Sequence, residues 1–244
     1  MTKPAILMLP GLLCDRANYE PQIDALAGRY LCHVPHYGQI DSIVGMAEHV
    51  LATAPAERFA LMGHSMGGRV ALEVLRRAPE RVERLALLDT GYQQIAGGEH
   101  GATERQSRMA LLHAAERDGM RVMADTWARG MVHPSRVGTP LFEAVLDMLA
   151  RSNPKVFAAQ INALLNRPDA TGLLGTIKCP TLVLLGREDH WSNLARHEAI
   201  HAAIPGSRLV VIEDCGHMST MEQPEAVNRA LAEWLDAEGV ADTL

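Results

Sequence analysis

Apolar and polar residues follow two patterns along this chain. Short apolar runs such as Ala5-Ile6-Leu7-Met8-Leu9 have no polar face, which is typical of strands buried on both sides of a sheet. The segments between them repeat apolar residues every three to four positions, the spacing of helices packed on one face. The pattern predicts strands at 5–9, 30–35, 58–62, 84–89, 181–185 and 208–212, and helices at 20–28, 42–54, 66–78, 193–203 and 222–238.

The regular alternation of strands and helices predicts an α/β fold with a mostly parallel, doubly wound sheet covered on both faces. One long helical segment, at about 103–166, interrupts the alternation late in the chain. Gly97-Gly98 is a plausible hinge into this insertion, and 171–176 leads back out of it. We therefore predict a core built from residues 1–95 and 170–244, with a helical cap at 96–169.

A stripe of large apolar residues follows one face of the insertion. Met120, Met123, Trp127 and Met131 stand at i, i+3, i+7 and i+11. Such a stripe most often packs against the main domain, but it can also roof a pliable substrate pocket. Adding neighbours of the site loops described below, we take as candidate pocket residues Leu13, Met123, Trp127, Trp191 and Met218.

The candidate nucleophile lies in Gly63-His64-Ser65-Met66-Gly67, between a predicted strand and a predicted helix. A serine at such a turn has a strained backbone, and the two glycines relieve crowding because a Cβ at either position would meet the neighbouring chain. The Ser65 hydroxyl would then be exposed at the head of the helix. The motif alone does not establish a nucleophile, and a serine that only caps a helix is common. The strand and helix around it favour the catalytic interpretation.

A serine hydroxyl needs a base to take its proton and a third group to orient that base. His217 follows the strand at 208–212, and Asp189 follows the strand at 181–185, so parallel strands would bring both to the edge that carries Ser65. The chain order Ser, Asp, His agrees with this kind of sheet. Asp89, which ends another strand, is the alternative acid. Glu188 and Asp214 are weaker rivals. Glu188 has a longer side chain and stands one residue earlier than Asp189, and Asp214 lies too near His217 in sequence to reach its ring.

The oxyanion formed by attack on a carbonyl requires donors that are already in place. One candidate is the backbone N–H of Met66, directly after the nucleophile. The other is the N–H of Leu12, in the loop after the first strand, where Gly11 permits a sharp turn.

Composition narrows the function classes. The chain has 244 residues and a net charge of −6 without a Lys/Arg cluster, which argues against a nucleic-acid partner. Charges interrupt every apolar stretch before it reaches membrane-spanning length, so no membrane partner is expected. The first strand begins at residue 5, which leaves no room for a signal peptide. The four cysteines lack zinc-binding spacing, so we expect no metal site and free thiols in the cytoplasm.

With these motifs the chain resembles the α/β-hydrolase superfamily over nearly its whole length, most of all the small esterases, lactonases and carbon–carbon bond hydrolases with one helical cap. The resemblance implies a Ser-His-Asp mechanism through an acyl-enzyme, without metal or organic cofactor. Members with an aspartate nucleophile are disfavoured because position 65 is serine. Many members have His-Gly in the oxyanion loop, where this chain has Pro10-Gly11. The motifs are Leu9-Pro10-Gly11, Gly63-His64-Ser65-Met66-Gly67-Gly68, Gly186-Arg187-Glu188-Asp189, and Gly216-His217 followed by Glu222-Gln223-Pro224.

We therefore predict a serine hydrolase whose partner is a small to medium, largely apolar carboxylic ester, because charged anchors are not evident from sequence. The alternative is a carbon–carbon bond hydrolase or lyase on a diketone or dienoic acid with the same triad, which usually needs an arginine for the substrate carboxylate. The arginines available are Arg69, Arg105, Arg129 and Arg187. A third hypothesis is a ligand-binding receptor that keeps the fold but turns over little.

Overall fold

The computed structural model describes residues 3–237, in which six parallel strands form one sheet in the order β2-β1-β3-β4-β5-β6. This confirms the predicted α/β fold with a parallel sheet. The chain runs outward from β1 to β2 and then crosses to β3 on the other side of β1, so the strand order reverses between β1 and β3. The strands are β1 (Ala5–Leu9), β2 (Leu31–His33), β3 (Phe59–His64), β4 (Val82–Leu88), β5 (Thr181–Gly186) and β6 (Arg208–Ile212).

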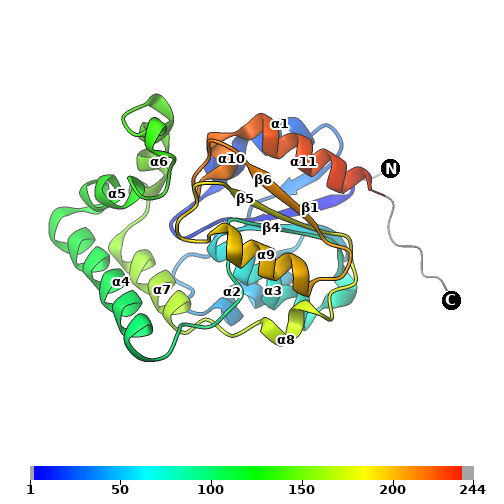
Figure 1. Ribbon diagram of the computed structural model, residues 1–244, viewed down its shortest axis with the longest axis horizontal. Coiled ribbons are helices and arrows are strands. Elements are labelled where there is room, and N and C mark those ends of the chain that lie inside the picture. Colours follow the sequence, from blue (N-terminus) through cyan, green and yellow to red (C-terminus); the bar gives the residue numbers. More distant parts are fainter. Residues whose placement is uncertain (1–2, 238–244) are drawn as a thin grey trace.

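Helices cover both faces of the sheet (Figure 1). On β1, Ile6 and Met8 belong to one hydrophobic cluster, and Leu7 and Leu9 belong to the other. Successive side chains of a strand point to opposite faces, so an uninterrupted apolar run fills both clusters at once. The first cluster packs under α1 (Glu20–Leu26) and α11 (Pro224–Asp236), and the second under α2 (Ile43–Thr53), α3 (Met66–Arg77) and α9 (Leu194–Ala203).

The four longer helices between β4 and β5 lie to one side of the sheet, coloured green in Figure 1. Their buried side chains, Phe142 and Phe157 among them, belong to the same hydrophobic cluster as Leu7 and Leu9. The helical insertion therefore shares its core with one face of the sheet. These helices are α4 (Gly98–Asp118), α5 (Met120–Ala128), α6 (Pro140–Ala150) and α7 (Pro154–Leu165). The 3-10 turn η3 (Pro134–Arg136) comes between α5 and α6 in the chain, and the short helix α8 (Thr171–Leu174) follows α7.

The bounds of several predicted elements differ from the structure, for example at 222–238 and at 30–35. The helix predicted at 222–238 begins two residues later, at Pro224, as α11, and a separate short helix, α10 (Ser219–Glu222), precedes it. Pro224 is the cause, because it has no N–H and its ring collides with the preceding turn, so it begins a helix but does not continue one. Residue 238, the predicted end, lies outside the described residues. The strand predicted at 30–35 is shorter and covers Leu31–His33. Two further 3-10 turns are η1 (Arg16–Tyr19), before α1, and η2 (Pro79–Arg81), before β4.

No helix within residues 3–237 combines the length and apolar character needed to cross a membrane. In the same part of the chain, no three His, Cys, Asp or Glu side chains gather as metal ligands.

Candidate active site

Ser65 stands at the sharp turn between β3 and α3, with φ of +55°, a region that residues other than glycine rarely adopt. Its N–H donates to Leu88 O at 2.9 Å, which fixes the turn against β4. A Cβ on Gly63 would lie 2.3 Å from the carbonyl oxygen of Gly67, and one on Gly67 would lie 1.9 Å from the carbonyl oxygen of Leu9. Both glycines are therefore required by close backbone approaches, as the motif predicts.

The structure brings the three predicted side chains together. His217 Nε2 lies 2.8 Å from Ser65 Oγ, and His217 Nδ1 lies 2.7 Å from Asp189 Oδ2. The other carboxylate oxygen of Asp189 accepts the backbone N–H groups of Trp191 at 2.8 Å and Ser192 at 2.9 Å. With Nδ1–H donating to Asp189, Nε2 is left free to accept the serine proton.

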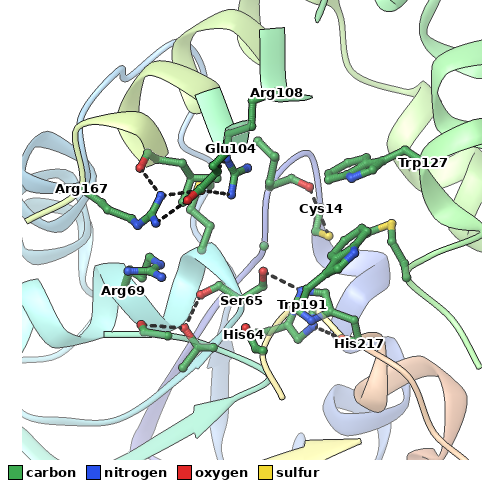
Figure 2. A pocket seen from close by; sticks show the side chains of 18 of the residues that line it. Cys14, His64, Ser65, Arg69, Glu104, Arg108, Trp127, Arg167, Trp191 and His217 are labelled. Carbon is green, nitrogen blue, oxygen red and sulfur yellow. Dashed lines mark hydrogen bonds and ion pairs between the residues drawn. The ribbon is translucent and has the colours of Figure 1, made fainter. Parts of the chain in front are cut away.

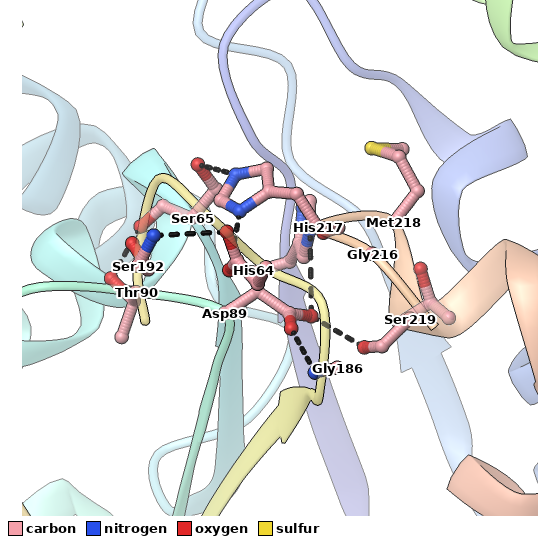
Figure 3. A network of polar contacts seen from close by, with 12 residues as sticks. His64, Ser65, Asp89, Thr90, Gly186, Ser192, Gly216, His217, Met218 and Ser219 are labelled. Carbon is pink, nitrogen blue, oxygen red and sulfur yellow. Dashed lines mark hydrogen bonds and ion pairs between the residues drawn. The ribbon is translucent and has the colours of Figure 1, made fainter. Parts of the chain in front are cut away.

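Asp89, the alternative acid, contacts other groups (Figure 3). One oxygen accepts the N–H of Gly186 at 2.9 Å, and the other accepts the hydroxyl of Ser219 and lies 3.7 Å from His64 Nε2. Burial raises the pKa of Asp89 well above its ordinary value. Asp89 is thus a buried carboxyl beneath the site, whereas Asp189 makes the hydrogen bond to the His217 ring.

Burial and charge pairing have opposing effects on the pKa values of Asp189 and His217. Burial alone would raise the pKa of Asp189, but the charge and hydrogen bond of His217, with two backbone N–H groups, lower it to about 2. Burial alone would lower the pKa of His217, but the charge and hydrogen bond of Asp189 raise it above 6.5. The carboxylate therefore stabilises the imidazolium that forms when His217 takes a proton.

His64 is a site residue that sequence reasoning missed. Its Nε2–H donates to the backbone carbonyl of His217 at 2.7 Å, so it supports the loop that carries the base. Burial, and then proximity to His217, lower the pKa of His64 to about 3, which keeps it neutral. Its place directly before Ser65, in the middle of the motif, was the one available sequence indication.

Leu12 and Met66 both line the cavity beside Ser65. Within residues 3–237, neither of their backbone N–H groups donates a hydrogen bond, so both remain available to an oxyanion. The inserted helix α7 holds the loop of Leu12 in place, because Gln160 on α7 accepts the N–H of Leu13 at 2.8 Å. Gln160 thus supports a loop in which Pro10 offers no side-chain hydrogen bond.

A cavity of about 440 Å³ opens over Ser65, between the sheet edge and the inserted helices. Trp127 and Trp191 line it, as predicted. The prediction is corrected for Leu13, Met123 and Met218, which do not line it and are buried in the hydrophobic core. Leu13 and Met218 stand next to site loops and Met123 belongs to the apolar stripe of α5, but all three side chains are packed in the hydrophobic cluster that one face of the sheet shares with the inserted helices.

The two tryptophans form an aromatic wall beside the base. Their rings stack with centroids 5.6 Å apart and planes 17° apart, and the ring of Trp191 lies 5.1 Å from that of His217. Trp127 comes from α5 and Trp191 from the loop after Asp189, so the stack joins the insertion to the loop that carries the acid.

The other end of the cavity is cationic. Figure 2 shows Arg69, Arg108 and Arg167 with Glu104 on one side of Ser65, and the tryptophans on the other. Arg196 also lines the cavity. Charged anchors, which were not evident from the sequence, therefore line one end of the cavity. Of the four arginines considered from sequence, Arg69 lines the cavity, while the others do not; the side chain of Arg129 pairs with Asp125, that of Arg187 pairs with Glu213, and Arg105 is exposed.

Glu222 connects the loop of the base to the insertion. Its buried carboxyl accepts the N–H groups on both sides of His217, from Gly216 and Met218, and also that of His133 at 2.7 Å. The N–H of His217 itself donates to the carbonyl of Met131 at 2.6 Å. The backbone of the base is therefore held by hydrogen bonds on three consecutive residues.

Solved structures with the same architecture include a hydrolase with related sequence. A thermophilic esterase from Thermogutta terrifontis, solved with malate bound, has 28% identity and a TM-score of 0.85, covering 96% of this chain and 90% of that one. The enol-lactonase from Burkholderia xenovorans LB400 has a TM-score of 0.83 at 21% identity, over 97% of this chain and 93% of its own, a likeness of fold alone.

Among curated proteins, the 2-hydroxy-6-oxononadienedioate/2-hydroxy-6-oxononatrienedioate hydrolase of Escherichia coli is 26% identical over 242 residues, covering 89% of this chain and 80% of that protein. The family model described as "Alpha/beta hydrolase family" matches residues 6–230, which include Ser65, Asp189 and His217. The strand order, the serine turn and this match agree, and the chain belongs to the alpha/beta hydrolase family.

Proposed function

We propose that this hydrolase cleaves small carboxylic esters through an acyl-enzyme, with Ser65 as nucleophile, His217 as base and Asp189 as the acid that orients it. One observation carries the proposal: His217 Nε2 lies 2.8 Å from Ser65 Oγ while Nδ1 lies 2.7 Å from Asp189 Oδ2. These are hydrogen-bond distances suited to proton transfer from the serine to the imidazole.

In the first half-reaction, Ser65 Oγ attacks the ester carbonyl carbon as its proton passes to His217 Nε2. The tetrahedral intermediate collapses when the bond to the alkoxy oxygen breaks, and His217 returns the proton to that oxygen, so an alcohol leaves. Water then attacks the acyl-enzyme, with His217 again taking and returning one proton, and the free acid and Ser65 are restored. Asp189 stays ionised throughout, which its lowered pKa of about 2 supports.

The backbone N–H groups of Leu12 and Met66 are the proposed oxyanion donors. Both line the cavity at Ser65, and Met66 is the first residue of α3, where the helix dipole also favours negative charge. One such donor typically contributes about 3 kcal/mol to the transition state, or roughly a hundredfold or more in rate.

A second candidate is hydrolysis of a carbon–carbon bond next to a ketone. It is favoured by the name of the Escherichia coli relative and by the arginines at one end of the cavity. The same groups would serve if the leaving carbon can accept the proton from His217 as its bond to the carbonyl carbon breaks. The geometry of the serine and histidine suits both reactions.

Covalent labelling tests the nucleophile. A fluorophosphonate should label the native protein and Ser65→Ala should abolish the label, while Ser152→Ala, at a serine that does not line the cavity, should keep it. Labelling that survives in Ser65→Ala, or a native protein that is not labelled, would refute the proposal, and the second result would favour a receptor that binds without turnover.

Product analysis separates the two reactions. 4-Nitrophenyl esters of C2 to C8 acids report ester cleavage by release of nitrophenolate, and a 2-hydroxy-6-oxo-dienoic acid reports carbon–carbon cleavage by loss of its dienol absorbance. We expect a higher kcat/KM on the esters. A kcat/KM on the dienoic acid at least tenfold higher than on every ester would make carbon–carbon cleavage the function.

A further inference from the structure

The cationic end of the cavity contains more positive charge than its own carboxylate can balance. Four arginines line it from separate elements, Arg69 on α3, Arg108 on α4, Arg167 after α7 and Arg196 on α9, and Glu104 is the one carboxylate among the described lining residues. Charged side chains that face a cavity without a counter-ion are costly, which makes such a cluster a candidate anion site.

Two of these arginines are already paired. Arg167 makes two hydrogen bonds to Glu104, at 2.7 and 2.9 Å, and Arg108 pairs with the same carboxylate at 2.9 Å. Arg167 also donates to the carbonyls of Gln93 and Leu164. These contacts join the start of α4 to the end of α7, so a structural role accounts for Arg167 and much of Arg108.

Arg69 and Arg196 are different. Within residues 3–237 the guanidinium of Arg69 donates to the carbonyl of Gln93 at 2.7 Å and that of Arg196 to the carbonyl of Trp191 at 2.9 Å, and neither pairs with a carboxylate. Burial, followed by the charges of Arg167, Arg196 and Arg108, lowers the pKa of Arg69 well below its ordinary value. The cluster is thus short of negative charge.

These two arginines meet beside the nucleophile. A Cβ on Gly91 would lie 2.6 Å from Arg69 Nη2 and 3.2 Å from Arg196 Cδ, so the glycine leaves room for both side chains. Arg69 follows Ser65 by one helical turn of α3, which places it on the same face of the helix. Both arginines, with Ser65, line the one cavity.

We propose that Arg69 and Arg196 form a subsite for a carboxylate of the substrate. The preferred substrate then carries an ionised carboxyl group on one side of the carbonyl that Ser65 attacks and an apolar or aromatic group on the other side. The inference rests on the proposed function and specifies its substrate class.

Two features select this ligand chemistry. A guanidinium presents parallel N–H groups that match the two oxygens of a carboxylate, and each of these arginines uses one nitrogen on a backbone carbonyl and keeps others for a ligand. On the opposite side of Ser65, the stacked rings of Trp127 and Trp191 offer a flat apolar surface. A substrate with one charged and one apolar end complements both.

A matched pair of esters tests the subsite. Mono-4-nitrophenyl glutarate carries a free carboxylate, and its methyl ester has the same glutaryl chain without the charge. The native protein should prefer the charged ester by at least tenfold in kcat/KM. Arg69→Gln should reduce this preference by about 10- to 100-fold, the usual consequence of losing a hydrogen bond to a charged group. Arg105→Gln, on the exposed side of α4, is the matched control and should keep the native preference.

Binding provides a readout that does not depend on turnover. Glutarate should bind to Ser65→Ala in a calorimetric titration, and binding should weaken by about 10- to 100-fold when Arg69→Gln is added. A native protein that hydrolyses the neutral ester at least as fast as the charged one would overturn the subsite and leave the proposed function intact. A native protein that binds glutarate but is not labelled by a fluorophosphonate would overturn the proposed function and leave the subsite intact. Tighter binding of inorganic phosphate than of glutarate would contradict the assignment to a carboxylate.

Discussion

Replacing Gly67 by alanine should damage both stability and reactivity, because the added methyl has no space. Its Cβ would lie 1.9 Å from the carbonyl oxygen of Leu9, 2.5 Å from the carbonyl carbon of Leu9 and 2.8 Å from the carbonyl oxygen of Pro10. All three atoms are backbone, at the end of β1 and the start of the oxyanion loop. The Leu9 carbonyl is also held by the hydroxyl of Tyr19 at 2.7 Å, so it cannot turn away without losing that hydrogen bond.

The structure sets the size of the effect. An ordinary carbon–oxygen contact needs more than about 3 Å, so α3 or the end of β1 must move by roughly 1 Å. Overpacked cores usually lose 1–3 kcal/mol, and we expect about 3 kcal/mol here because rigid backbone must yield. A shift of about 1 Å between nucleophile and oxyanion donors should lower kcat/KM about 100-fold.

Urea unfolding and ester kinetics measure the two effects. With an m value of about 3 kcal/mol/M, the unfolding midpoint should fall by about 1 M. Gly172→Ala is the matched control, because a Cβ there meets nothing within 4 Å and the residue lies in helix α8. It should be neutral or stabilise the protein by up to about 1 kcal/mol. If Gly67→Ala unfolds and reacts like the native protein, the close approach between α3 and β1 is not the reason for this glycine.

Three further predictions concern the site. Asp189→Asn should lower kcat/KM about 10⁴-fold because it leaves the wrong histidine tautomer, whereas Asp89→Asn should lose about tenfold at most; the reverse order would exchange their roles. The kcat/KM should fall toward low pH, because protonated His217 cannot accept a proton, and its raised pKa should place the midpoint of that limb above 6.5; a midpoint below 6.5 would contradict this. Burial raises the pKa of Cys14 to about 12, so iodoacetamide at pH 8 should leave turnover unchanged, and rapid inactivation that requires Cys14 would show a reactive thiol.

Local patterns predicted the elements well where a single physical rule decides them. A strand such as β1, buried on both faces, has to be apolar throughout, and a serine at a turn this tight requires glycines at 63 and 67. Prediction was weaker at element ends: the helix predicted from residue 222 begins at Pro224, because a proline can begin a helix but cannot continue one from a preceding turn.

From the sequence, only those site residues that follow a parallel strand could be predicted, because the ends of such strands lie at a common edge of the sheet. Ser65, Asp189 and His217 each follow a strand, and a parallel sheet brings such positions together whatever their separation in sequence. Gln160 and Arg196 could not be found in this way. Each lies in a helix with an ordinary pattern, and each reaches the site through packing between elements distant in sequence.

The amino-acid order by itself therefore determined the layered sheet, the strained turn and the choice of an alcohol, an imidazole and a carboxylate, because each depends on neighbours within a few residues or on strand polarity. Only the tertiary structure decided which carboxylate meets the imidazole and that the cavity has a cationic and an aromatic end. Those features depend on where long side chains from separate helices and loops converge, and the local periodicity of the sequence does not encode distances between separate elements.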